Sequence, residues 1–247
     1  MKLAVLGVVI CAVAAAALWR VLGVSAEGAD QARRRAQSPS GTSLVAHDSS
    51  GRGNNGVNQG NPRLGLPGHR GTSYSFDAEG SWIDVPSVDD LNPGRRNFTV
   101  SAWVRLRTLP EHHGDYDILR KGLSSTSEYK IEVMRGGQVR CIAKDTAGHV
   151  ARITGMGHPL STGRWHWIGC SRVAGTWTVH ADAHAESTRV RLGSIATSMP
   201  LSIGSNYGLE DAPQGEIDDV RLRVGGSTVG LWHLDERPAP SDATTSR

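Results

Sequence analysis

An alternating run of apolar and polar residues from Asn97 to Leu106 is the strongest structural signal in this chain. The apolar residues of one parity are Phe98, Val100, Ala102, Val104 and Leu106. The residues of the other parity are Thr99, Ser101, Trp103 and Arg105. Because successive side chains of a β-strand point to opposite faces, the pattern predicts a strand with one face in a core. Its other face carries polar groups and a single tryptophan.

Further short alternating runs follow, separated by turn residues rather than by helical patterns. They lie at 74–77, 82–85, 116–121, 129–134, 138–144, 165–172, 177–183, 201–204, 215–222 and 229–234. The chain contains 30 glycines, as many tight turns require. Strands at this spacing with no helices between them predict an all-β fold built as a two-sheet antiparallel sandwich.

The first 26 residues form a separate segment, in which an apolar run follows Lys2 and the small residues Val24-Ser25-Ala26 follow the run. This order is typical of a signal peptide. The run is long and ends in Trp19-Arg20, so an uncleaved membrane anchor stays open as the alternative. We therefore expect a secreted protein, or a cell-surface protein tethered through the N-terminal segment.

The remaining boundaries follow from where apolar periodicity begins and ends. Residues 27–41 have none and are predicted to be a flexible linker. Residues 42–236 form the predicted folded domain, and 237–247 a disordered tail. The net charge is +3, and the arginines are scattered rather than clustered on one face. Because nucleic-acid binding needs a clustered basic surface, we expect no nucleic-acid partner, and we expect a monomer.

Two cysteines, Cys141 and Cys170, fall in strand patterns. Cys141 has the parity of Val139 and Ala143, and Cys170 has that of Ile168. Two inward cysteines on neighbouring strands suit a cross-sheet disulfide, which belongs in an oxidising compartment. Two unrelated buried thiols are the alternative, and the expected export favours the disulfide.

Seven short motifs, taken in order, resemble the laminin-G-like, concanavalin A-like jelly-roll domain of bacterial exported proteins. They are Asp48–Gly56, Tyr74–Asp77, Phe98–Val104, Ile118–Lys121, Trp165–Ile168, Leu201–Gly204 and Gly215–Leu222. The resemblance implies a jelly roll, and paired cysteines like Cys141 and Cys170 occur in a subset of the family. It says little about function, because this fold hosts lectins, adhesins, enzymes and inert spacers.

The chain departs from the family at its opening strand, where a Trp-x-Leu-Asp-Glu sequence is usual before the turn at Asp48. That sequence stands instead near the C-terminus, in the segment 230–236 that includes Trp232. We hypothesise that this segment fills the empty position, as in a circular permutation. The hypothesis predicts a buried Trp232 and pairing of the final segment with the strands near residues 45 and 75. The alternative is a vestige of a following repeat.

The resemblance also implies a structural calcium ion. Carried over, its ligands would be the carboxylates of Asp48 and Asp218, with carbonyl or amide oxygens of Gly51, Asn54 or Gly56. Asp218 has the parity of the apolar residues that follow it, so we expect it to point inward. The alternative is that Asp48 caps its own turn and that backbone amides bind Asp218.

Catalysis is not expected from these motifs. Laminarinase-type glucanases share the fold and use a Glu-x-Asp-x-x-Glu strand, whose two glutamates act as nucleophile and acid. The segment from Glu216 through Asp218 begins that pattern, but Arg221 replaces the second glutamate. We therefore expect no enzyme, with a glycoside-hydrolase relative as the alternative.

Sugar binding is the other hypothesis, because aromatic rings stack on sugars. Trp103, Trp165 and Trp167 have polar-face parity, with Arg105 beside them. The resemblance implies that Trp103 and Trp165 are structural, so Trp167 is the better candidate. We expect a non-catalytic module that binds a glycan or an extracellular protein. A structural domain without a ligand is the further alternative.

Overall fold

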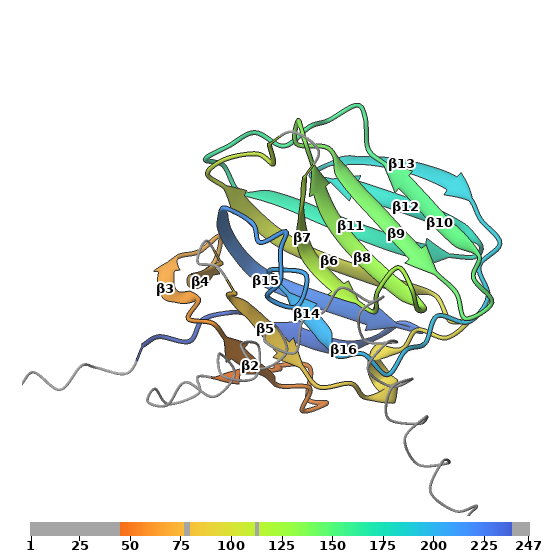
Figure 1. Ribbon diagram of the computed structural model, residues 1–247, viewed down its shortest axis with the longest axis horizontal. Helices are drawn as coiled ribbons and strands as arrows, with labels where there is room; N and C mark the ends of the chain where they lie inside the picture. The colour runs from red at the N-terminus through yellow and green to blue at the C-terminus, as the bar shows by residue number, and fades with distance from the viewer. Residues whose placement is uncertain (1–44, 77–79, 112–113, 239–247) are drawn as a thin grey trace, which may run out of the picture. The chain divides into compact units, whose positions relative to one another are not determined.

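The computed structural model describes residues 45–76, 80–111 and 114–238. They belong to one compact unit that spans Thr42–Arg247, and two antiparallel β-sheets dominate it (Figure 1). The predicted leader 1–26, the linker 27–41 and most of the tail lie outside the described residues. Within the described part, no helix is long and apolar enough to span a membrane.

The first sheet has eight strands in the order β1-β2-β5-β14-β7-β8-β9-β10. Their bounds are β1 Val45–Ala46, β2 Gly56–Gln59, β5 Trp82–Val85, β14 Leu201–Ile203, β7 Asp115–Lys121, β8 Glu128–Met134, β9 Val139–Lys144 and β10 Val150–Thr154. Every pairing within it is antiparallel. A 3-10 turn, η1 (Asp89–Leu91), follows β5.

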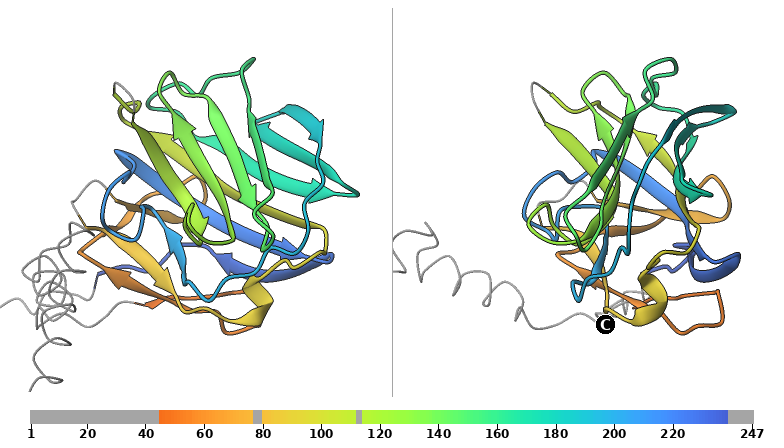
Figure 2. Two further views of the ribbon diagram at one scale, coloured as in Figure 1. Left: turned by 45° about the vertical axis from the view of Figure 1, so that its right-hand side comes forward. Right: turned by 90° about the vertical axis from the view of Figure 1, so that its right-hand side faces the viewer.

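The second sheet has the order β13-β12-β11-β6-β15-β4-β3, with β16 also paired to β15. Its strands are β3 Arg63–Pro67, β4 Thr72–Ser75, β6 Phe98–Leu106, β11 His166–Val173, β12 Thr176–Ala181, β13 His184–Arg189, β15 Gly215–Val224 and β16 Ser227–Trp232. The turned views show this sheet facing β7 to β10 of the first (Figure 2). The predicted two-sheet antiparallel jelly-roll fold is confirmed.

Strand β6 lies inside the second sheet between β11 and β15, as its alternating pattern requires. Its apolar residues are at most 2% exposed, whereas Trp103 and Arg105 on the other face are partly accessible. The two sheets bury their apolar faces against each other, and the resulting core supplies most of the stability by removing that surface from water. The predicted orientation of this strand is therefore confirmed.

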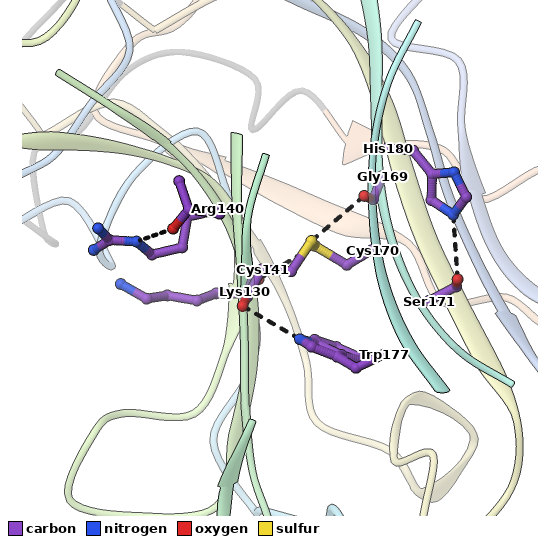
Figure 3. The surroundings of a disulfide bond; sticks show 9 residues. Lys130, Arg140, Cys141, Gly169, Cys170, Ser171, Trp177 and His180 are labelled. Carbon is purple, nitrogen blue, oxygen red and sulfur yellow. Dashed lines mark hydrogen bonds between the residues drawn. A yellow bond between two sulfur atoms is a disulfide. The ribbon is translucent and has the colours of Figure 1, made fainter. Parts of the chain in front are cut away.

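A disulfide joins the two sheets through the core. Cys141 on β9 and Cys170 on β11 are bonded, their Cα atoms are 5.6 Å apart, and both residues are fully buried. Figure 3 shows the bridge between the sheets, with the ring of Trp177 beside it and its indole N–H donating to the carbonyl of Cys141. The predicted cross-sheet bond is confirmed.

The end of the domain lies against its beginning. Trp232 is fully buried and forms a β-bridge with Asp48, and the amide of Ser49 donates to the carbonyl of Leu231. Further along, Glu236 accepts from the backbone of His47 and from the hydroxyl of Tyr74. The predicted burial of Trp232 is confirmed, and the segment is paired with Asp48 through one bridge. Its strand pairing is with β15, and near residue 75 it makes hydrogen bonds, among them the one to Tyr74.

Candidate functional site

The outer face of the second sheet carries the predicted aromatic residues. Trp103 on β6 is paired directly with Trp167 on β11, so the two indole side chains share a face. Trp165 precedes β11, and the guanidinium of Arg105 lies 4.9 Å from its ring centroid. The structure therefore brings together all four residues predicted to contact a ligand. We call Trp103, Arg105, Trp165 and Trp167 the tryptophan face.

Two of the three rings are already covered from within the domain. His69, from the turn between β3 and β4, stacks on Trp103 with ring centroids 3.5 Å apart and planes 9° apart. Arg105 covers Trp165 in a cation–π arrangement. These contacts agree with a structural role for Trp103 and Trp165. Sequence analysis did not find His69, because nothing in a Gly-His-Arg-Gly turn shows which strand the turn will cover.

Trp167 is partly exposed like the other two, but no ring stacks on it and no cation lies over it among the described residues. Its one ring contact within the described residues is with His180, at 5.6 Å between centroids and tilted by 57°. Trp167 is partly exposed, and the next residues of β11 on the same face, Gly169 and Ser171, are small. A flat apolar ring bordered by small and polar groups is a surface on which a sugar ring can stack.

The first carboxylate of the glucanase-like segment is already paired. Glu216 lies opposite Arg105, which contacts one of its carboxylate oxygens at 3.1 Å, and Arg107 contacts the other at 3.1 Å. Arg221 replaces the second acid and is exposed on the same outer face, opposite Ser101. The carboxylate of Glu216 is therefore bound by two arginines and serves as an ion-pair partner.

Asp218 lies on the outer face, and the prediction that it points inward is wrong. It is paired with Trp103, whereas Ile217 is paired with Val104 on the core face. Between Asp218 and Arg221, β15 has one residue more than the facing part of β6, and Asp219 in this bulge has a φ of 48°. The extra residue means that the residues after the bulge have the opposite parity to Asp218. The alternation of this strand in sequence therefore does not continue through the bulge.

Asp218 is nevertheless buried, because the turn that carries His69 covers it. One carboxylate oxygen accepts from the amide of Arg70 at 3.0 Å, and the other has no hydrogen-bond partner among the described residues. Burial raises the pKa of Asp218 to about 6, with the nearby Asp219 adding to the effect and backbone amides opposing it. A buried carboxyl without a full set of donors favours its neutral form.

Substituting Asp218 with asparagine is expected to stabilise the domain at about pH 8 by about 1–3 kcal/mol, with little change at about pH 4. The raised pKa means that the folded protein keeps this proton to about pH 6, whereas the unfolded chain loses it near 3.8. Stability therefore falls as the pH rises between these values, and Asp218→Asn removes that loss. Urea denaturation at both pH values measures it. An equal pH dependence in the variant would contradict the prediction.

The predicted calcium ligands at the first turn are engaged by hydrogen-bond donors. One oxygen of Asp48 accepts from the amides of Ser50 and Leu231, and the other from the hydroxyl of Ser50 and the amide of Asn54. Burial would raise the pKa of Asp48, but these donors outweigh it and lower the pKa. The geometry matches the alternative in which Asp48 caps its own turn.

Asn54, another predicted calcium ligand, is also engaged by hydrogen bonds. The carbonyl of Asn54 accepts from the indole of Trp232 at 2.9 Å, and the side-chain amide donates to Val229 at 2.7 Å. Gly56 lies within β2, and Gly51 is in the exposed turn. These hydrogen bonds agree with the alternative of a turn capped by Asp48, and the calcium ion shared by the five residues stays a prediction.

Another acidic cluster lies on the outer face of the first sheet. Carboxylate oxygens of Asp115, Asp117 and Glu132 lie within 4.8 Å of one another. The ammonium of Lys130 contacts Glu132 and lies 3.4 Å from Asp117, so it takes the place among these oxygens that a cation would need. Burial and the neighbouring carboxylates raise the pKa of the adjacent Asp211 to about 7. Lys130 therefore already supplies one positive charge to this acidic cluster.

Comparisons with known proteins agree with this architecture. A family model described as the concanavalin A-like lectin/glucanases superfamily, Laminin_G_3, matches residues 77–223. Because the match covers more than half of the chain, the protein belongs to this laminin-G-like family. The comparison with curated proteins found no match.

Solved structures with the same fold include receptor-binding and ligand-binding domains. The receptor binding domain of botulinum neurotoxin D has a TM-score of 0.58 at 15% identity, over 76% of this chain and 47% of that one. The serotype D ligand binding domain in complex with N-acetylneuraminic acid has a TM-score of 0.55 at 14% identity, over 78% and 45%. The binding domain of Paraclostridial Mosquitocidal Protein 1 has 0.51 at 16%, over 79% and 48%.

This likeness is one of fold. The chain spans about half the length of the structures that it matches, at identities of 14–16%. What those domains bind is therefore a property of those domains.

Proposed function

We propose that this domain is an extracellular binding module for carbohydrate, which it contacts through Trp167 on the tryptophan face. The carrying observation is that Trp167 keeps a partly exposed ring, while Trp103 and Trp165 beside it are covered by His69 and Arg105. A sugar stacks its apolar face on such a ring, and neighbouring polar groups bind its hydroxyls. An extracellular protein that contacts the same face is the alternative partner.

Two further observations support this proposal. The family includes lectins by its own description, and one structural neighbour was solved with N-acetylneuraminic acid. The buried disulfide suits an oxidising compartment, which agrees with export of the chain. We propose on this basis that the domain acts outside the cytoplasm, as a secreted or tethered monomer.

The proposed module has no glycosidase activity. Glycoside hydrolysis needs two carboxyl groups on opposite sides of the bond, one as acid and one as base or nucleophile. Glu216 is held by two arginines, and Arg221 stands at the position of the second glutamate. Incubation with β-glucans should therefore release no reducing sugar.

Trp167→Ala is expected to weaken binding to a retained glycan at least about tenfold, which corresponds to about 1.4 kcal/mol. The reason is the loss of the stacking surface, while the buried core beneath is unchanged. A glycan array identifies the ligand, and titration calorimetry with that glycan measures the change. The matched control is Trp82→Ala, which removes a partly exposed tryptophan from β5 on the other sheet.

The outcomes separate the candidate functions. Retention that Trp167→Ala abolishes and Trp82→Ala preserves supports the proposal. Equal retention by both variants rejects the tryptophan face, and no retained glycan favours a protein partner or a structural domain. Calcium remains a prediction, and repeating the titration in a chelator tests whether a cation contributes to binding.

A further inference from the structure

Three side chains at one end of the second sheet form a linear hydrogen-bonded series. The hydroxyl oxygen of Ser161 lies 3.1 Å from Nε2 of His166, and Nδ1 of the same ring lies 2.7 Å from a carboxylate oxygen of Asp182. A nucleophile, a base within hydrogen-bond reach and a carboxylate that orients the base are the parts of a serine acyl-transfer site.

The three residues come from different parts of the fold: a strand, a turn and a loop. Trp165 and Trp167 point outward, so the intervening His166, paired with Val104, points to the inner side at the end of β11. Asp182 begins the turn between β12 and β13, in a left-handed conformation with φ 53°. Ser161 precedes the turn that leads into β11.

Asp182 is fixed to β11 by its backbone as well as by its side chain. Its amide donates to the carbonyl of Trp167 at 2.7 Å, and its second carboxylate oxygen accepts from the amide of Trp167 at 2.9 Å. The carboxylate is therefore held in place and can orient the ring of His166 without help from substrate.

The hydrogen bond to Asp182 sets the tautomer of His166. A carboxylate accepts only, so Nδ1 carries the proton and the lone pair of Nε2 faces Ser161. The amide of Ser161 also approaches Nε2, at 3.2 Å, slightly farther than the hydroxyl. Its carbonyl lies at 3.2 Å as well, where it can accept from Nε2 once the ring is protonated.

The proposed nucleophile is accessible to solvent, and the histidine behind it is largely buried. Ser161 is exposed, whereas the side chain of His166 is only 12% exposed. A pocket of about 150 Å³ lies at the same end of the sandwich, and its lining includes Ala181 and His184 on either side of the turn that holds Asp182. Val179 and Gly155 also line this pocket, whereas Ser161, His166 and Asp182 lie outside its lining.

We propose that Ser161 and His166 are catalytic residues for hydrolysis of small carboxylic esters, with Asp182 as the positioning residue. Oγ of Ser161 attacks the ester carbonyl carbon, and its proton passes to Nε2 of His166. The bond to the alcohol breaks, and the alkoxide leaves with that proton. Water then attacks the acyl-serine, gives a proton to Nε2, and releases the carboxylic acid as Ser161 regains its hydrogen.

The negative oxygen that forms on the ester carbonyl needs a hydrogen-bond donor, and the amide of Thr162, next to Ser161 in the sequence, is the candidate. In α/β-hydrolases the residue after the nucleophile supplies one of the two oxyanion donors. Thr162 follows Ser161, and its amide makes no hydrogen bond within the described part of the chain. This activity goes beyond the proposed binding function and does not depend on it. It also differs from the expectation, drawn from the sequence, that the chain is not an enzyme. The sequence contains no Gly-x-Ser-x-Gly motif that would predict a nucleophilic serine.

The test is covalent labelling of the whole protein with a fluorophosphonate, followed by peptide mass spectrometry, together with hydrolysis of p-nitrophenyl acetate. We expect the label on Ser161 and an esterase rate that Ser161→Ala reduces about 100-fold. Asp182→Asn should lower kcat and leave KM unchanged, because it disturbs the base rather than the substrate contact. Ser187→Ala is the matched control, since Ser187 is an exposed serine on β13 whose hydroxyl contacts Thr178 at 2.9 Å rather than a histidine.

Labelling of the unmodified protein decides the question even where a variant folds poorly. No label on Ser161, or an esterase rate equal in the unmodified protein and Ser161→Ala, would overturn the proposal. An effect of Asp182→Asn on KM alone would remove Asp182 from the site. A glycan-binding result with Trp167→Ala has no bearing on any of these outcomes.

Discussion

Replacing Trp232 with alanine is expected to lower the free energy of unfolding by about 3–5 kcal/mol. Trp232 is fully buried, and its indole donates to the carbonyl of Asn54 at 2.9 Å. The substitution leaves a large cavity and a buried carbonyl without its donor, and both effects destabilise the folded state. Urea denaturation followed by circular dichroism measures the change.

Trp232→Ala is expected to weaken the contact between the two ends of the domain as well as the packing of the core. Trp232 ends β16, which pairs with β15, and it also forms the bridge to Asp48. Its ring packs over Gly230, where any Cβ atom would overlap it, so this position of the ring requires a glycine there. Loss of the ring therefore loosens the contact between the two ends of the domain.

Trp82→Ala is the matched control for this experiment. Trp82 is partly exposed on β5 and meets Tyr207 edge-on at 5.7 Å between centroids. Its substitution should cost about 1–2 kcal/mol, since much of the ring already contacts water. Equal losses in the two variants would mean that the C-terminal segment does not complete the core, contrary to the structure.

The period of two in the sequence predicts β6 well because β6 itself carries no extra residue: its pairing with β11 is regular, and the bulge in its pairing with β15 lies on β15. From Phe98 to Leu106 one face meets the core throughout, so a single parity holds. On β15 the same reasoning fails at Asp218. A bulge is a mismatch in residue number between two strands, and one strand read alone does not reveal it.

The candidate site was predictable only where it lies along a strand. Trp103 and Trp167 have outward parity on β6 and β11, and cross-strand pairing then places them side by side. His69 and Asp182 belong to turns, whose direction depends on tertiary contacts rather than on a repeating pattern. The stacked His69 and the Ser161 series therefore become visible only in the folded chain.

Removing the disulfide by the double substitution Cys141→Ala and Cys170→Ala is expected to lower the free energy of unfolding by about 3–4 kcal/mol. The two cysteines are separated by 29 positions in sequence. Closing a loop of this length restricts the unfolded chain, and in the loop-entropy description this raises its free energy by about that amount. Urea denaturation of the oxidised protein and of the variant measures the difference.

Because the disulfide is buried, its presence or absence in the purified protein also reports whether the chain folded in an oxidising compartment. Both sulfurs are fully buried between β9 and β11, so the bond must form before or while the sheets pack together. Protein exported to an oxidising compartment should have a mass lower by about two hydrogens than the dithiol form, because the bridge replaces two thiols. The same chain from a reducing cytoplasm should refold with the lower stability of the variant.

Reductant separates the covalent link from the packing of the cysteine side chains. Dithiothreitol should destabilise the natural protein under denaturing conditions and leave the double alanine variant unchanged. Each single substitution should cost nearly as much as the double one, because either opens the same loop. A natural protein equally stable with and without reductant would show that the packed core alone holds the two sheets together.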